Sequence, residues 1–159
     1  MLPLSAKPSA MARLSFVLAV LLQLLFCYAA VSKMADLEKF QTEVGQSPLL
    51  TYFVGAVVIL VPLTEIAAVV LLFFPKTRLW GMYLSLLLMV SFTAYVFAIM
   101  RFAAYVPCSC GGILTDMTWS QHLAFNIVFT ALALAGVVLE EASTAKKKNN
   151  KIYLPVYIR

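Results

Sequence analysis

Charged residues are scarce in this sequence. Only 12% of its 159 residues are charged and 63% are hydrophobic, whereas roughly a quarter of the residues of a soluble domain are charged. Four apolar stretches are each about as long as the ~20 residues that a helix needs to cross a bilayer. The composition therefore excludes an ordinary soluble domain. It predicts an all-α fold, a four-helix transmembrane bundle.

The polar breaks in the sequence divide the chain into segments. We expect membrane spans at 14–32, 49–74, 79–100 and 119–138. In the loop after the first span, Asp36 is placed to cap a short surface helix that Gly45 and Pro48 would end. The domain organisation that follows is an N-terminal segment at 1–13, a four-span membrane domain at 14–140 and a basic tail at 141–159.

The positive charges are unevenly placed, although the net charge is only +5. They gather before the first span, in the turn Pro75-Lys76-Thr77-Arg78, and in the tail. Clusters that flank membrane helices indicate the positive-inside bias rather than nucleic-acid binding. Four spans put all three clusters on one side, so we expect both termini to be cytoplasmic in a bacterial inner membrane. The loop at 102–118 then faces the periplasm, where disulfides persist.

That loop contains Cys108 and Cys110, two of only three cysteines in the chain. They lie in Pro107-Cys108-Ser109-Cys110-Gly111-Gly112 and could close a small, strained disulfide ring. Strained, exposed disulfides tend to be the labile or catalytic ones. A structural disulfide, a metal half-site and unreactive thiols are the alternatives. We favour a redox pair and expect no metal, because a tetrahedral zinc site would also have to recruit Cys27 and His122, the only histidine.

Glu65 is the most costly residue for a membrane protein, because it is ionisable and lies within the second span. It is a candidate proton carrier or partner of a bound cofactor. Alternatively, a protonated Glu65 could bond to a backbone carbonyl that Pro62 leaves free inside a kinked helix. Counting along the helices puts Lys33 and Arg101 near the outer boundary, so neither is an evident partner for Glu65.

Three further residues are candidates for supporting roles. His122 and Asn126 share one helix face at i and i+4, where they either tune a nearby thiol or hydrogen-bond across helices. Cys27 lies about 8 Å inside the outer end of the first span. It is either a relay for the redox pair or a small hydrophobic residue. Aromatic side chains in the spans could stack on a quinone.

Several short motifs resemble a known family. Lys33-x-x-Asp36-x-x-x-Phe40 and Pro62-x-x-Glu65 are similar to the DoxX-like group. The Cys-x-Cys-x-Gly loop, followed by Trp119, His122 and Asn126, resembles the MauE branch of methylamine-utilisation proteins and their redox-associated relatives. The similarity covers about residues 13–140. The family loop usually reads Cys-Gly-Cys-Phe-Gly, and here it reads Cys-Ser-Cys-Gly-Gly.

The resemblance implies a membrane protein that supports disulfide formation or electron transfer in extracytoplasmic proteins. MauE is associated with maturing the disulfide-rich small subunit of methylamine dehydrogenase, and its relatives accompany thioredoxin-like proteins. By resemblance, Cys108 and Cys110 are the redox pair, and Lys33, Glu65, His122 and Asn126 are its polar signature. Arg101 and His122 are the nearest residues in sequence that could favour a thiolate, and a quinone is the expected electron acceptor.

The alternative is a non-catalytic subunit of a larger complex with a structural Cys108–Cys110 disulfide. The oligomeric state stays open.

Overall fold

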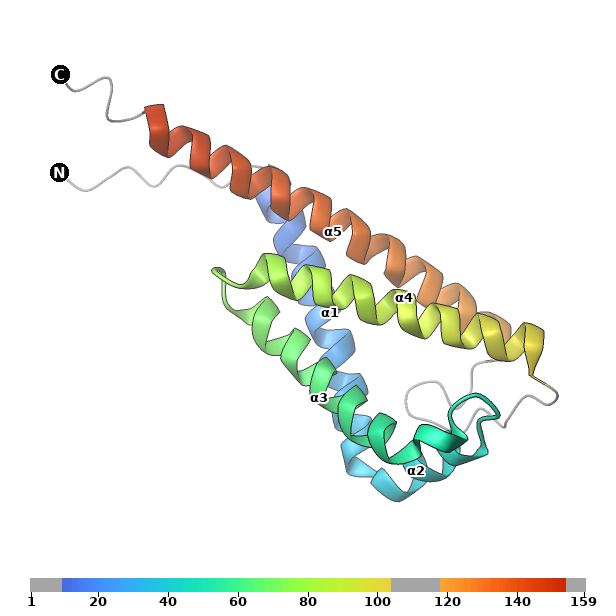
Figure 1. Ribbon diagram of the computed structural model, residues 1–159. Coiled ribbons are helices and arrows are strands. Elements are labelled where there is room, and N and C mark those ends of the chain that lie inside the picture. Colours follow the sequence, from blue (N-terminus) through green and yellow to red (C-terminus); the bar gives the residue numbers. More distant parts are fainter. Residues whose placement is uncertain (1–9, 104–117, 154–159) are drawn as a thin grey trace.

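The computed structural model describes residues 10–103 and 118–153, with the side chains of the last helix described to Lys146. Its elements are α1 (Ala10–Ala35), α2 (Leu37–Gln46), the 3-10 turn η1 (Thr51–Phe53), α3 (Val54–Phe73), α4 (Arg78–Phe102) and α5 (Trp119–Tyr153) (Figure 1). Within these two ranges no strand occurs. The predicted all-α class is confirmed.

Four helical segments are long and apolar enough to cross a membrane: Ala10–Ala35, Thr51–Phe73, Arg78–Phe102 and Trp119–Lys146. This confirms the four spans, although several boundaries differ from the prediction; the second long helix, for example, starts at Val54 rather than at 49. The first helix starts earlier than 14, and the last continues well past 138. The sequence after Val138 is rich in Glu, Ala and Lys, which favour helix even outside an apolar environment. The basic tail therefore begins as an extension of α5.

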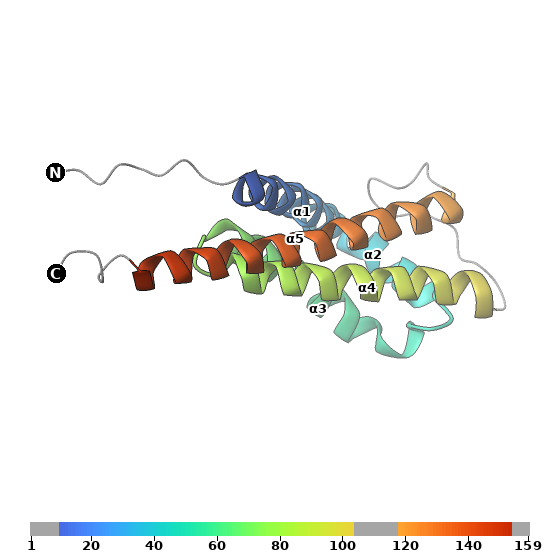
Figure 2. The ribbon, with the colours of Figure 1, turned by 90° about the horizontal axis from the view of Figure 1, so that it is seen from above.

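The long helices form a closed ring in which α1 packs on α3, α3 on α4, α4 on α5, and α5 on α1. Figure 2 shows α5 running beside α4 and continuing beyond it. We call the end where α4 stops and α5 starts the loop end, and the end with the α3–α4 turn the turn end. The shared core consists mainly of aliphatic, methionine and alanine side chains, among them Leu22, Phe26, Leu72, Met82 and Ala133.

The outer surface of the ring is also apolar. Each long helix exposes large hydrophobic side chains, for example Leu24, Ile59, Leu87 and Leu134. A soluble monomer rarely exposes an apolar surface of this extent. Because these side chains surround a bundle whose interior is already filled, lipid is the environment that suits them. The chain is a multi-pass membrane protein.

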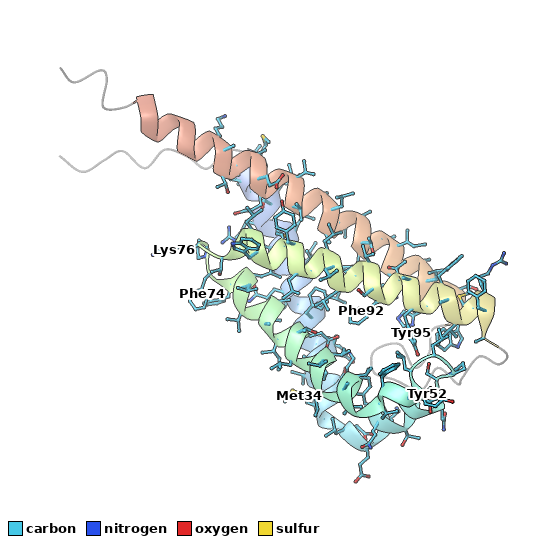
Figure 3. The ribbon with its side chains drawn as sticks, in the orientation of Figure 1. Met34, Tyr52, Phe74, Lys76, Phe92 and Tyr95 are labelled. Atoms are coloured by element: carbon cyan, nitrogen blue, oxygen red, sulfur yellow. The ribbon has the colours of Figure 1, made fainter. Side chains whose placement is uncertain are left out.

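Polar contacts fix α5 at the turn end. The Ser15 hydroxyl of α1 donates to the Glu140 carboxylate, and the Tyr83 hydroxyl of α4 donates to the neighbouring Glu141. The guanidinium of Arg78 lies 5.3 Å from the centre of the Phe16 ring. The two hydroxyl contacts join α1 and α4 to α5 just where that helix leaves its apolar stretch, and the Arg78–Phe16 contact joins α4 to α1. Figure 3 shows Phe74 and Lys76 at this end, opposite Tyr52 and Tyr95.

Local capping rules explain where α2 and α5 start. Asp36 precedes α2, and its Oδ1 accepts from the backbone N–H of Lys39 at 3.1 Å; the helix ends at Gln46. This confirms the predicted surface helix and its cap. Before α5, Thr118 Oγ1 accepts from the N–H of Gln121, and Gln121 Oε1 accepts from the N–H of Thr118. This reciprocal pair is a capping box, and it fixes the first turn of α5 directly after the cysteine loop.

Two glycines allow helices to approach closely. A Cβ added at Gly81 would lie 2.7 Å from the backbone N of Leu72, because the start of α4 packs against the last turn of α3. A Cβ added at Gly136 would lie 2.9 Å from Sδ of Met82, which is the mobile end of a flexible side chain. Only the first contact is with rigid backbone.

We therefore expect Gly81→Ala to destabilise the bundle by about 1–3 kcal/mol, the usual cost of overpacking, and Gly136→Ala to cost less because Met82 can move. Thermal unfolding in detergent, followed by circular dichroism, measures both. Gly55→Ala is the control, since its new Cβ meets nothing within 4 Å. Equal melting temperatures for Gly81→Ala and Gly55→Ala would contradict the close α3–α4 approach.

Candidate functional site

A buried ion pair joins α1 to α3 inside the membrane domain. Nζ of Lys33 lies 2.7 Å from Oε1 of Glu65. The Glu65 side chain is fully buried, whereas that of Lys33 is 23% exposed. Oε2 of Glu65 is buried and has no hydrogen-bond partner within the described residues. The pair is thus sealed on the carboxylate side and reaches the surface on the ammonium side.

Lys33 is the partner of Glu65, which corrects the expectation that it lies too near the outer boundary. That expectation assumed that all helix ends are level. In the structure α1 ends at Ala35, just after Lys33, while α3 extends from Glu65 toward the loop end as far as Val54. This half of α3 extends past the end of α1 and packs against α2. The last turn of α1 therefore lies beside the middle of α3, where its lysine reaches Glu65.

Aromatic rings surround the ammonium group of Lys33. Nζ is 5.8 Å from the centre of the Phe40 ring on α2 and 6.0 Å from that of Phe92 on α4. It also donates to the backbone carbonyl of Ala29, 3.2 Å away. Figure 3 shows Phe92 and Tyr95 on the side of α4 that faces α3 and α2. Cation–π contacts of this kind attract an ammonium group toward aromatic rings.

Further polar contacts connect the helices between the middle of the bundle and the loop end. The Tyr95 hydroxyl of α4 donates to Oγ of Ser47, which follows α2, at 2.9 Å. Thr93 and Thr130 share a hydrogen bond of 3.0 Å between α4 and α5. Ser47 is buried, so its hydroxyl needs such a partner. These contacts fix α2 and α5 relative to the face of α4 that lies beside Lys33.

Two more titratable residues lie within electrostatic range of Lys33. One is His122, which is half-buried in the first turns of α5. The centre of its ring lies 6.3 Å from that of the Trp119 ring. Glu43 on α2 is the other, and its buried Oε1 has no hydrogen-bond partner within the described residues. Burial raises the pKa of Glu43 above its ordinary value of 4.5, although nearby Lys39 and Lys33 act in the opposite direction. The polar cluster, as we call it, consists of Lys33, Glu65, Glu43 and His122.

The other predicted site residues lie outside this cluster. Asn126 is buried next to it, and its side-chain amide donates to the His122 carbonyl within α5 at 3.0 Å. Arg101 is exposed in the last turn of α4. Cys27 is a free, exposed thiol, one residue beyond the buried Phe26.

Cys108 and Cys110 lie outside the described residues. In the part of the chain that the structure describes, no three His, Cys, Asp or Glu side chains converge as metal ligands would.

Sequence reasoning missed Glu43 and Ser47. Both lie on the loop after the first span, where Glu43 looked like one of several surface charges. The spacing of Phe40, Val44 and Ser47 marks one face of α2, and Val44 and Ser47 on it are buried. A helical-wheel analysis of residues 37–46 could have placed Glu43 at the edge of that face. The Tyr95–Ser47 contact has no signal in the sequence, because it depends on tertiary packing.

The fold and the polar cluster together define a four-span helical membrane protein with an ion pair buried between its first and third long helices. Compared with family models, residues 11–139 match the one described as methylamine utilisation protein MauE. The chain belongs to the MauE family. Searches of the curated proteins and of the solved structures found no match. Family membership ties this membrane protein to methylamine utilisation, and the wider DoxX-like relationship stays a prediction.

We expect Lys33→Met to destabilise the protein by on the order of 3 kcal/mol, because it leaves the Glu65 carboxylate buried without a cation. Adding Glu65→Leu should restore much of the loss, since the double variant has no buried charge. Thermal unfolding in detergent tests both variants, with Lys39→Met on the exposed face of α2 as the control. A double variant no more stable than Lys33→Met would contradict the pairing.

The raised pKa of Glu43 predicts a pH dependence of stability. Because the Glu43 carboxyl holds its proton more tightly in the folded protein than in the unfolded chain, the free energy of unfolding falls as the pH rises from 4.5 through the folded-state pKa. We therefore expect Glu43→Gln to be more stable than the unmodified protein near neutral pH and to lose this advantage below about pH 4.5. Melting temperatures over that range, with the exposed Glu38→Gln as control, test this. A difference that does not change with pH would contradict it.

Proposed function

We propose that this protein is a membrane thiol–disulfide redox protein that supports disulfide formation or electron transfer in extracytoplasmic proteins. Its partners would be thioredoxin-like proteins or clients of the methylamine-dehydrogenase type. Membership of the MauE family supports the link to methylamine utilisation. The observation that carries the proposal is the position of the two cysteines between two helices of the bundle. The segment with Cys108 and Cys110 joins α4 to α5 at the loop end, the end at which Lys33, Glu43 and His122 gather.

The proposed reaction is an exchange of one disulfide for two thiols. A client thiolate attacks the Cys108–Cys110 disulfide and forms a mixed disulfide, which the second client thiol resolves. The client loses two electrons and two protons and becomes a disulfide, and Cys108 and Cys110 become thiols. Each cycle then requires an acceptor that takes the same two electrons from the pair.

The distribution of charge supports an orientation for this reaction. At the turn end lie four basic residues: Arg13 and Arg78 near the starts of α1 and α4, Lys76 in the turn before α4, and Lys146 at the end of the apolar span of α5. By the positive-inside bias, we propose that this end is cytoplasmic in a bacterial inner membrane and that the loop end is periplasmic. Cys108 and Cys110 would then meet their clients in an oxidising compartment.

The second candidate is a non-catalytic subunit in which Cys108–Cys110 is a structural disulfide. The buried Lys33–Glu65 pair favours it, because buried pairs also occur as purely structural elements. The two candidates differ in one property. A structural disulfide resists mild reductants and its loss lowers protein abundance, whereas a catalytic disulfide cycles and its loss lowers client oxidation.

Acid quenching of membranes and labelling with a heavy maleimide, before and after a pulse of mild reductant, tests the proposal. We expect Cys108 and Cys110 to be oxidised, to be reduced by the pulse and to re-oxidise when the reductant is removed. Cys108→Ala should keep normal abundance and lose client oxidation. A pair that resists the reductant, with low abundance of Cys108→Ala, would favour the structural candidate, and permanently reduced thiols would contradict both.

The exposed position of Cys27 gives a separate prediction. Because its thiol lies on the outside of α1, we expect Cys27→Ser membranes to re-oxidise the pair at the same rate as unmodified membranes in the same labelling experiment. A clearly slower re-oxidation would instead make Cys27 a relay between the pair and its acceptor.

A further inference from the structure

We infer that the Lys33–Glu65 pair binds the head group of a lipophilic quinone, which accepts the electrons of Cys108 and Cys110. This inference rests on the proposed function, because a protein that oxidises thiols needs an acceptor and the Lys33–Glu65 pair lies inside the membrane domain. Glu65 is about 21 Å along the helix from the outer end of its span at Thr51. An acceptor that reaches this depth must be soluble in the hydrocarbon core.

The hydrogen-bonding capacity of the pair is not used up. A lysine ammonium has three N–H donors; two of them face Glu65 Oε1 and the Ala29 carbonyl. Oε2 of Glu65 has no partner among the described residues, although the side chain is completely buried. The carboxylate is sealed from the surface, so a ligand can reach only the ammonium, which can donate one more hydrogen bond. A donor left without a protein partner between aromatic side chains is costly, so an uncharged acceptor on a ligand is a physical explanation for it.

The surroundings of the pair suit a flat, uncharged ring. Phe40 and Phe92 lie about the ammonium on two different helices, and Lys33 retains 23% exposure while Glu65 has none. A ligand that enters from the surface meets the ammonium first, between aromatic side chains. This arrangement gives one polar contact at the end of an apolar approach, as most small-molecule sites do.

The charge of the pair argues for a quinone rather than an anion such as a lipid phosphate. Lys33 and Glu65 together are neutral, so the site has no net attraction for a second negative charge, and Glu43 nearby is acidic as well. A quinone is neutral before and after reduction. Its carbonyl accepts a hydrogen bond from the Lys33 ammonium, the exposed member of the pair.

The electrons and protons balance in this reaction. Cys108 and Cys110 lose two protons and two electrons as their S–S bond forms. The quinone gains two electrons and two protons and leaves as the quinol. Lys33 stabilises negative charge that develops on the quinone oxygen. Glu65 acts as a positioning residue, because it orients the ammonium and does not itself exchange electrons.

The test is binding of decylubiquinone to the purified full-length protein in nanodiscs, measured by competition with a photoreactive azidoquinone and peptide mapping. We expect labelled peptides from α1, α2 or α4 around Lys33, Phe40 and Phe92. Lys33→Met/Glu65→Leu should bind about tenfold more weakly or worse, the loss expected for one charge-assisted hydrogen bond. Its control is Glu38→Leu/Lys39→Met, which removes the same two charges from the exposed side of α2 and should bind like the unmodified protein.

The outcomes separate this inference from the proposed function. Decylubiquinone that binds the Lys33→Met/Glu65→Leu variant as tightly as the unmodified protein overturns the site. If Cys108 and Cys110 exchange disulfides with a dithiol peptide but the unmodified protein binds no quinone, the inference fails and the proposed function stands. If quinone binding depends on Lys33 but the cysteines never cycle, the binding site stands and the proposed function fails.

Discussion

The contact between Lys33 and Glu65 is the interaction on which the arrangement of this membrane protein depends. An ionised carboxylate in a membrane span is costly without a cation beside it, and the cation comes from the last turns of a different helix. The pair therefore fixes the axial position of α1 relative to α3. Because α1 ends beside the middle of α3, the chain turns at Asp36 and α2 packs along the half of α3 nearer the loop end. That path brings Phe40 and Glu43 to the ammonium.

The two ends of the bundle use polar contacts differently. At the turn end, Glu140 and Glu141 accept hydroxyl donors from α1 and α4, and these contacts locate α5. Between the middle of the bundle and the loop end, one carboxylate oxygen each of Glu65 and Glu43 is buried without a partner within the described residues, and Lys33 is within electrostatic range of Glu43 and of His122. Unsatisfied buried groups are costly, and functional sites are the common place for such a cost. This difference is why the loop end, rather than the turn end, is the candidate site.

Local features of the sequence predicted local structure well. Apolar length gave the four spans, and Asp36 with Gly45 gave the cap and extent of α2, because spans and caps depend on neighbouring residues alone. The Lys33–Glu65 pair could not be obtained this way: counting from helix ends assumes level ends, and only packing shows that α1 stops short. The same holds for Tyr95 with Ser47, whose contact joins α4 to the segment after α2. The roles of Cys108 and Cys110, which lie outside the described residues, stay predictions from the sequence.

The most direct test of the account is a single turnover without oxygen. Purified protein with reduced Cys108 and Cys110 is mixed with decylubiquinone in nanodiscs, and quinol absorbance and maleimide-reactive thiols are followed together. We expect quinol and disulfide to appear at the same rate and in equal amounts, and Cys108→Ser/Cys110→Ser to form neither. Loss of the two thiols without quinol, or quinol formation in the cysteine-free variant, would contradict it.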